Sequence, residues 1–352
     1  MLLTIITFII ILGLLIFVHE FGHFIVAKLA KVKVEEFAFG FPPRLFSIKR
    51  GETRYSLNAI PLGGYVKLFG EEEDTDQQGS FHSKSVFSRA GIVIAGIFMN
   101  FVLAIVLMTI GFSIGMTPLV SDPETLSGQK DSKVMVVYVE PESPAQKAGL
   151  EQGVVINGFS SINDLQSFTK SHVNEEVDLS IVKNRKTESL RLKLGEDKEA
   201  PLGVAIVPIT KVKQPVWDAF KTSIKETGQA VAAIGVFLWD ILRNIFTTGK
   251  PGEAAEGVVG PVGLFNFTSQ AIKIGWIYVL QLVAILSINL GIINFLPIPA
   301  LDGGKVLFIA LEGIFRRKVV RQEIENIIHL VGFVLMILLF LLITFKDIRS
   351  LF

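Results

Sequence analysis

The stretch "ILGLLIFVHEFGHFIVAKLA", residues 11–30, sets two histidines and a glutamate inside an apolar run. A run of this length and composition predicts a helix that spans a membrane. Such a helix gains nothing from ionisable groups, and burying them without partners costs several kcal/mol. Because ionisable residues inside a spanning helix are functional by default, His19, Glu20 and His23 are candidates for a site.

The composition supports a membrane protein. Of the 352 residues, 50% are hydrophobic and 19% are charged, and the mean hydropathy is +0.52, well above that of a soluble domain. With a net charge of +1, the chain has no excess of positive charge that would indicate nucleic-acid binding. The chain has no cysteine, so disulfides, thiolate metal sites and cysteine nucleophiles are excluded. Any metal must be held by His, Asp or Glu.

Three further apolar runs, residues 90–115, 277–296 and 327–345, are each close to the roughly 20 residues that cross a bilayer. No Lys or Arg precedes the first run, which argues against a signal peptide. We therefore expect four spanning helices.

A fifth candidate, residues 229–246, is short and carries Asp240 and Arg243. Four spans place the ten Lys/Arg between Lys28 and Arg89 on the same side as the basic loop before the last span, and the positive-inside rule makes that side cytoplasmic. A fifth span would separate the two segments. We expect 229–246 to be an amphipathic helix on the outer membrane surface, and the N-terminus to be extracytoplasmic.

Between the second and third spans lie about 160 residues of mixed polarity. Alternating stretches at 133–140, 177–183, 189–194 and 202–207 predict strands, and 163–171 predicts a helix, which together indicate a small β-rich domain. The expected order along the chain is a first span (1–30), a cytoplasmic β-loop region (31–86), a second span (87–116), the β-rich domain (117–212), a surface helix and linker (213–275), a third span (276–312), a basic loop (313–325) and a fourth span (326–352).

The sequence His19-Glu20-Phe21-Gly22-His23 fits the pattern His-Glu-x-x-His. Residues four apart on a helix share a face, so both imidazoles can bind one ion. The glutamate beside the first ligand can accept a proton from a water at the open coordination position. This five-residue pattern also occurs by chance, but its place inside a spanning helix favours the metal site.

A third ligand is needed, and Asp302 is the best candidate. It follows Pro297 and Pro299, which break the third span, and its alternative role is an N-cap for the helix that resumes at Gly303. At 1.5 Å per residue, His19 lies about 26 Å and Asp302 about 30 Å from the outer face of the membrane. The two residues therefore fall at similar depth, near the cytoplasmic face. Two histidines, an aspartate and an open position form a catalytic zinc arrangement. An iron site uses the same ligand types, but Glu20 favours hydrolysis.

With both segments in view, the whole chain resembles the site-2 protease family of intramembrane zinc metalloproteases, most closely the bacterial RseP-type members. His19-Glu20-x-x-His23 matches the first family motif, and Asn294-x-x-Pro297-x-Pro299-x-Leu301-Asp302-Gly303 matches the second. The resemblance implies Zn²⁺ held by three ligands, a catalytic glutamate, and substrate contacts in the second motif. Those residues are His19, His23 and Asp302 for zinc, Glu20 for catalysis, and Asn294, Pro297 and Pro299 for substrate.

Residues 36–70 resemble the family's membrane-reentrant β-loop, with short strands expected at 45–48 and 54–58 and with Gly63 and Gly64 permitting close approach of a backbone. The alternative is an ordinary cytoplasmic hairpin. A strand edge in this loop would give an unwound substrate new hydrogen-bond partners.

The β-rich domain resembles a PDZ domain through Ser143-Pro144-Ala145-x-x-Ala148-Gly149-Leu150 and Ile156-Asn157-Gly158. It departs from the pattern at Val154, where an Asp is usual, so a filter against large ectodomains is as good an interpretation as peptide binding.

The expected fold is an α-helical polytopic membrane protein with four transmembrane helices, a membrane-reentrant β-hairpin loop and an inserted extracytoplasmic PDZ-like domain. The expected activity is cleavage of transmembrane segments in the bacterial inner membrane. The resemblance implies single-pass substrates in the lipid bilayer, either anti-sigma factors already shortened outside or leftover signal peptides. A non-catalytic scaffold and a metal transporter remain alternatives. We interpret His329, at the start of the last span, as a buried, hydrogen-bonded histidine.

Overall fold

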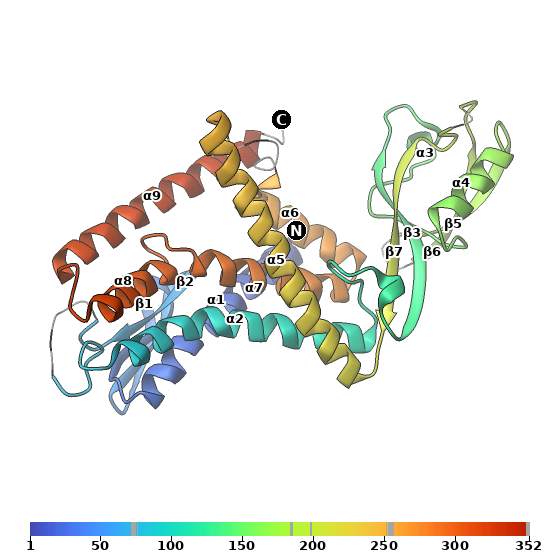
Figure 1. Ribbon diagram of the computed structural model, residues 1–352. Helices are drawn as coiled ribbons and strands as arrows, with labels where there is room; N and C mark the ends of the chain where they lie inside the picture. The colour runs from blue at the N-terminus through green and yellow to red at the C-terminus, as the bar shows by residue number, and fades with distance from the viewer. Residues whose placement is uncertain are drawn as a thin grey trace. The chain divides into compact units, whose positions relative to one another are not determined.

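The computed structural model describes residues 1–71, 75, 77–183, 186–197, 199–250, 252 and 257–349, apart from the side chains of Pro61 and Leu62 (Figure 1). The chain divides into two compact units. The first is Met1–Val106, Thr227–Thr268 and Val283–Phe352, and the second is Leu107–Glu226 and Ser269–Leu282. The metal-binding motifs belong to the first unit, and the predicted β-rich domain belongs to the second.

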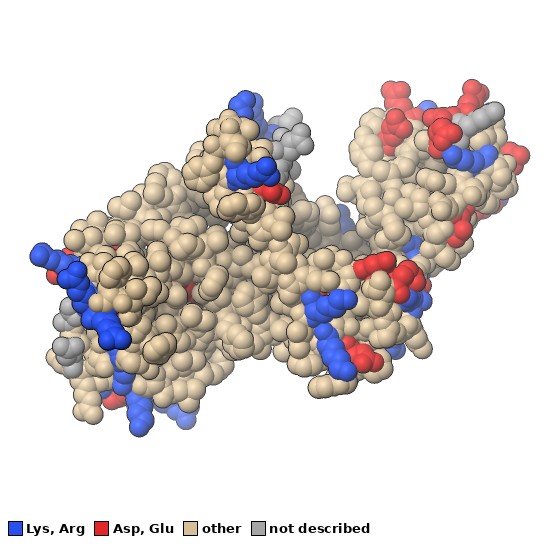
Figure 2. All heavy atoms as spheres, in the orientation of Figure 1, with Lys and Arg blue, Asp and Glu red and all other residues tan. Residues whose placement is uncertain are grey.

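Helices dominate the first unit, and several of them continue into the second. They are α1 (Leu2–Leu29), α2 (Val86–Ile114), α5 (Val216–Thr248), α6 (Pro261–Ile274), α7 (Trp276–Phe295), α8 (Asp302–Phe315) and α9 (Gln322–Arg349). Uncharged residues cover most of the helical surface on the face shown in Figure 2. Such a surface is what a bilayer interior requires of spanning helices.

Within the described residues, five helices are long and apolar enough to cross a membrane: α1, α2, α5, α7 and α9. The chain is therefore a multi-pass membrane protein. The sequence analysis expected four spans and a short surface helix at 229–246. The structure instead has α5 as one helix of 33 residues, which qualifies as a span by length and composition. The exact number of spans and the surface position of α5 remain predictions.

A long hairpin follows α1. Its strands, β1 (Val34–Arg50) and β2 (Thr53–Leu68), are much longer than the predicted segments 45–48 and 54–58. The first half of β1 pairs with both halves of β2: Phe37 lies opposite Tyr55 and also opposite Val66. Among the described residues this sheet has only these two strands. The last part of β2, residues 64–68, therefore pairs on one side and keeps an open edge.

Apolar packing fixes the hairpin to the helices. Val34 and Leu68, at the two ends of the hairpin, are buried in one cluster with Ala27 of α1 and Ile92 of α2. Burial of such side chains contributes about 1.5–3 kcal/mol each for the larger ones. This cluster holds the open edge of β2 beside α1.

The β-rich domain forms in the second unit, as expected. Its sheet has the order β6-β5-β4-β3-β7, and helices α3 and α4 pack beside it (Figure 1). Val177, Leu179 and Ile181 of β5 are buried while the residues between them are exposed, the alternation of a strand with one buried face. The bounds are η1 (Pro123–Thr125), β3 (Gln129–Val139), α3 (Pro144–Lys147), β4 (Val155–Ile156), α4 (Ile162–Ser171), β5 (Glu176–Lys183), β6 (Lys186–Lys193) and β7 (Val204–Lys213).

Candidate metal centre

Helices α1 and α8 bring three predicted ligands together. The Asp302 Oδ2 atom lies 3.0 Å from His19 Nε2 and 3.3 Å from His23 Nε2. The two Nε2 atoms are 3.2 Å apart, since residues four apart on α1 share one face. Two motifs almost 280 residues apart in sequence therefore converge on one point.

This triangle fits a zinc ion. Four tetrahedral ligands at 2.0–2.1 Å from zinc lie about 3.3 Å from one another, close to the three observed separations. Asp302 Oδ2 is buried and has no hydrogen-bond partner among the described residues. A buried carboxylate oxygen without a partner is costly, and a cation at the centre of the triangle removes that cost.

The orientation of the His23 ring supports the same interpretation. Its Nδ1 lies 2.9 Å from the carbonyl oxygen of Ile92 on α2, so Nδ1–H donates to that oxygen. In the neutral ring Nε2 then carries a lone pair. That nitrogen faces Asp302 Oδ2 at 3.3 Å, the position of a second metal-binding atom. Backbone anchoring of the second ring nitrogen is the usual arrangement of a metal-binding histidine.

The side chain of Asn100 on α2 contacts the second ring nitrogen of His19. This residue was not predicted from the sequence. Its amide nitrogen lies 3.1 Å from His19 Nδ1, and its Oδ1 is buried without a partner among the described residues. The two ends of a side-chain amide have nearly the same shape, so the group can turn by about 180° in the same space. Exchanging them lets Oδ1 accept a hydrogen bond from Nδ1–H and leaves Nε2 free for a metal. The signal in the sequence is a single asparagine within an apolar run.

Gly96, one turn before Asn100, lets α2 come this close. A Cβ built on Gly96 would lie 2.3 Å from His23 Nε2, far inside contact distance. Ser287 of α7 donates to the backbone oxygen of Asn100 at 2.7 Å. Helices α1, α2 and α7 therefore surround the paired imidazoles.

The interrupted segment after α7 delivers Asp302. Helix α7 ends at Phe295, and α8 begins at Asp302 with Leu301 as its N-cap. The alternative in which Asp302 is merely the N-cap is therefore wrong. The loop between the helices holds Pro297 and Pro299, and the amide nitrogen of Ile298 donates to the oxygen of Leu296 at 2.7 Å.

The remaining predicted residues lie around this centre. Asn294 Nδ2 is 3.5 Å from His19 Nε2, so the amide faces the metal ligands. A Cβ on Gly64 would lie 3.3 Å from Glu20 Cγ, so this part of β2 lies close to the proposed catalytic side chain. Gly63 has no room for a Cβ, because the ring of Phe41 occupies that space.

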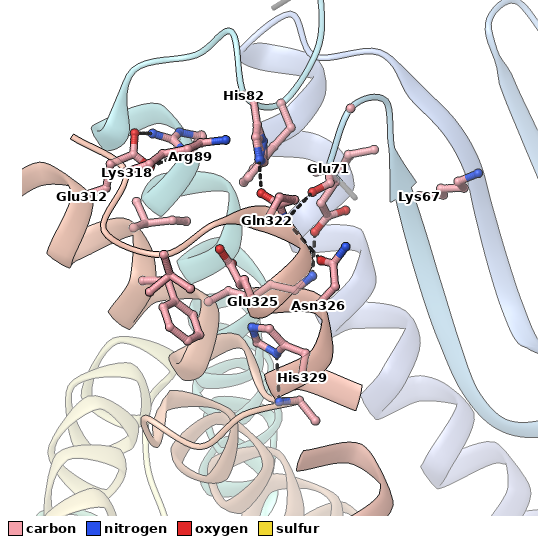
Figure 3. A pocket seen from close by; sticks show the side chains of 18 of the residues that line it. Lys67, Glu71, His82, Arg89, Glu312, Lys318, Gln322, Glu325, Asn326 and His329 are labelled. Atoms are coloured by element: carbon pink, nitrogen blue, oxygen red, sulfur yellow. Dashed lines mark hydrogen bonds and ion pairs between the residues drawn. The ribbon is translucent and has the colours of Figure 1, made fainter. Parts of the chain in front are cut away.

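A cavity of about 710 Å³ is lined by residues from the end of β2, from α8 and from α9 (Figure 3). Charged pairs line it. Lys305 Nζ contacts Glu71 Oε1 at 2.6 Å, and Arg89 makes two contacts with Glu312 at 2.5 and 3.0 Å. His329 also lines the cavity.

Comparison with known proteins supplies independent evidence. The model of the family described as "Peptidase family M50" matches residues 7–339. A Fusobacterium nucleatum protein named "Putative zinc metalloprotease" is 33% identical over 98% of both chains. The zinc metalloprotease RasP of Oceanobacillus iheyensis is 30% identical over 99% of both chains.

Proposed function

This chain belongs to peptidase family M50 and is a zinc metalloprotease, and we propose that it cleaves peptide bonds within the transmembrane segments of other membrane proteins. The observation that carries the proposal is the triangle of His19 Nε2, His23 Nε2 and Asp302 Oδ2, in which both histidines come from a helix apolar enough to span a membrane. A hydrolytic centre with such surroundings is suited to substrates that are themselves in the bilayer.

In the proposed mechanism, His19, His23 and Asp302 would hold zinc. Zinc, when bound, polarises the scissile carbonyl and lowers the pKa of a water toward about 7. Glu20 takes the proton of the attacking water and later delivers it to the leaving amine. Asn294, whose amide faces the ligands, donates to the substrate backbone near the scissile bond.

The open edge at residues 64–68 of β2 gives the substrate its backbone partners. A transmembrane helix must unwind locally before a protease can reach its peptide bonds, and each freed N–H or C=O in lipid then needs a new partner. Strand addition to this edge supplies them. Gly64 on this strand lies close to Glu20, which supports an added strand that passes near the proposed catalytic carboxylate. Pro297 and Pro299 keep the loop between α7 and α8 from continuing as a helix.

The substrates we propose are single-pass proteins of the bacterial inner membrane, either anti-sigma factors already shortened outside or remnants of signal peptides. The N-terminus is extracytoplasmic and the cut lies near the cytoplasmic face. The β-rich domain acts as a PDZ-like module that binds peptides or excludes bulky ectodomains. A metal-transport path would need several ligand clusters, whereas the described residues contain one group of three candidate ligands.

The test is Glu20→Gln in the purified full chain, with a transmembrane reporter in detergent micelles. General base catalysis contributes about 10²–10⁴-fold, so we expect at least that loss of turnover with the zinc content unchanged. Glu188→Gln, an exposed glutamate of β6, is the matched control and should cleave at the wild-type rate. Equal turnover of Glu20→Gln and wild type would end the proposed mechanism.

A further inference from the structure

Helix α9 is fixed at few points. Its buried residues, among those described, are Gly332 and Asp347. The Asp347 carboxylate accepts from the backbone nitrogens of Gly260 and Gly263 at the start of α6, at 3.3 and 2.9 Å. Gly332 instead packs on the loop before α8: a Cβ there would lie 2.5 Å from Pro299 Cβ. One end of α9 therefore supports α6, and its middle supports the loop that carries Asp302.

His329, one turn before Gly332, bonds to the same loop. Its Nδ1 accepts a hydrogen bond from the backbone nitrogen of Ala300 at 2.9 Å, as Figure 3 shows. The ring of Phe308 on α8 packs against the imidazole at 5.7 Å between centroids and 62° between planes. The imidazole is thus held on two sides and cannot turn away without losing both contacts.

Ala300 is a backbone position that needs such support. Its φ is +77°, in the left-handed region that residues with a Cβ rarely adopt. A strained backbone conformation persists only where several contacts with its surroundings hold it in place. His329 binds the amide of this residue, and Gly332 packs on the residue before it. The direction of α8, which begins two residues later, follows from the conformation of Ala300.

We propose that His329 is a positioning residue of the metal centre. By accepting the Ala300 N–H, it fixes the turn from which Asp302 projects toward His19 and His23. His329 belongs to neither sequence motif, and the sequence analysis interpreted it as a buried, hydrogen-bonded histidine. The hydrogen bond is present, and its partner gives it a role at the site. This inference rests on the proposed zinc site, because it acts through the carboxylate of Asp302.

The experiment compares two variants of nearly the same shape. His329→Asn keeps an acceptor near the position of Nδ1, whereas His329→Leu removes it. The zinc affinity of each full-length variant is measured by competition with a chelator in detergent. Loss of a supporting hydrogen bond around a metal site typically costs 10–100-fold in affinity. We expect about a 10-fold loss for His329→Leu, at the lower end because the effect passes through the backbone, and less than about a threefold loss for His329→Asn.

The same substitution in an Asp302→Ala background separates positioning from a general structural role. If His329 acts through Asp302, His329→Leu will cause no further loss of zinc affinity there. Wild-type affinity in His329→Leu, equal losses in the Asn and Leu variants, or an undiminished loss in the Asp302→Ala background would each overturn the proposal. Equal zinc affinity in Asp302→Ala and wild type would instead refute the zinc site on which it rests.

A second variant covers the case in which His329→Leu does not fold. Gly332→Ala pushes a methyl group into Pro299 and should lower zinc affinity with the same dependence on Asp302. Gly235→Ala, a helical glycine of α5 with open space around its Cβ position, is the matched control and should leave the affinity unchanged. Equal affinities in the two alanine variants would contradict the proposed support of the loop by α9.

Discussion

The side chains of the β-rich domain and those of the metal centre are buried for different reasons. In β5 of the domain, Val177, Leu179 and Ile181 alternate with exposed residues, and burial of one face explains this alternation. In α1, by contrast, the hydrophobic pattern would be complete without His19 and His23, and Asp302 presents a buried oxygen without a partner among the described residues. Packing accounts for the first region, whereas the proposed metal ion gives the buried polar groups of the second a common purpose.

This contrast predicts opposite responses to substitution. Where side chains are present for packing, their removal lowers the free energy of unfolding and leaves zinc binding intact. Where polar side chains are buried for a ligand, their removal abolishes zinc binding, with little loss of stability in the zinc-free protein. Both expectations can be tested, one with a variant of a proposed ligand and the other with a variant of the domain core.

The largest effect is expected for Asp302→Ala. Without its carboxylate the site has two ligands, and we expect zinc affinity to fall by more than the roughly 100-fold that loss of a supporting residue can cost. Zinc content after dialysis, together with chelator competition, measures the change. Asp240→Ala, an exposed aspartate of α5, is the control. Retention of stoichiometric zinc by Asp302→Ala would show that the two motifs do not form one site.

The converse variant is Leu179→Ala in the domain. Leu179 is 1% exposed and lies in the domain's own core, so truncation should cost about 2–5 kcal/mol of unfolding free energy. Hydrogen exchange with mass spectrometry, followed in peptides from β3 and β5, measures this loss in the intact chain. Zinc affinity should not change, since the residues of this core are distinct from the ligands.

The neighbouring exposed residue Ser180 supplies the control for that variant, because Ser180→Ala removes no buried surface. Surface changes of this kind usually stay within about 0.5 kcal/mol. If Leu179→Ala lowered zinc affinity as strongly as Asp302→Ala, the two regions would be energetically coupled and the comparison would fail.

The same contrast explains what the sequence could predict. Helix α1 and the strands of the domain follow from length and periodicity, which are properties of contiguous residues. The pair His19 and His23 is recognisable because both residues share one face of one helix. Asp302 was expected from the interrupted span and its depth in the bilayer, and the structure places it beside the pair.

Other features depend on contacts between distant segments. Asn100 is one polar residue in an apolar run, and its meaning appears only when α2 packs against α1. His329 likewise gains its partner from a loop 29 residues earlier. The hairpin was underestimated because Pro42 and Pro43 normally end strands, whereas β1 continues through them to Arg50. Here pairing with β2 overrides local propensity.

The smallest expected effect concerns a charged pair on the surface of the domain. Asp178 on β5 faces Arg191 on β6, whose Nε and Nη2 donate to the two carboxylate oxygens at 3.0 Å each. These hydrogen bonds, together with the charge of the guanidinium, lower the pKa of Asp178. A depressed pKa in the folded state means that the pair stabilises the domain above the unfolded value of about 3.9. The contribution is lost as the pH falls through the lower, folded pKa.

Because both side chains are exposed, solvent and salt screen the pair, and the effect on stability should be small. Titration of the Asp178 carboxyl carbon by NMR in the labelled full chain measures the pKa directly. Arg191→Gln should raise it toward the ordinary value and leave zinc affinity unchanged. An unaltered Asp178 titration in Arg191→Gln would show that the arginine does not set this pKa. A change in zinc affinity would contradict the contrast itself, since a solvent-exposed pair in the packed domain would then influence a site whose polar groups are buried around a cation.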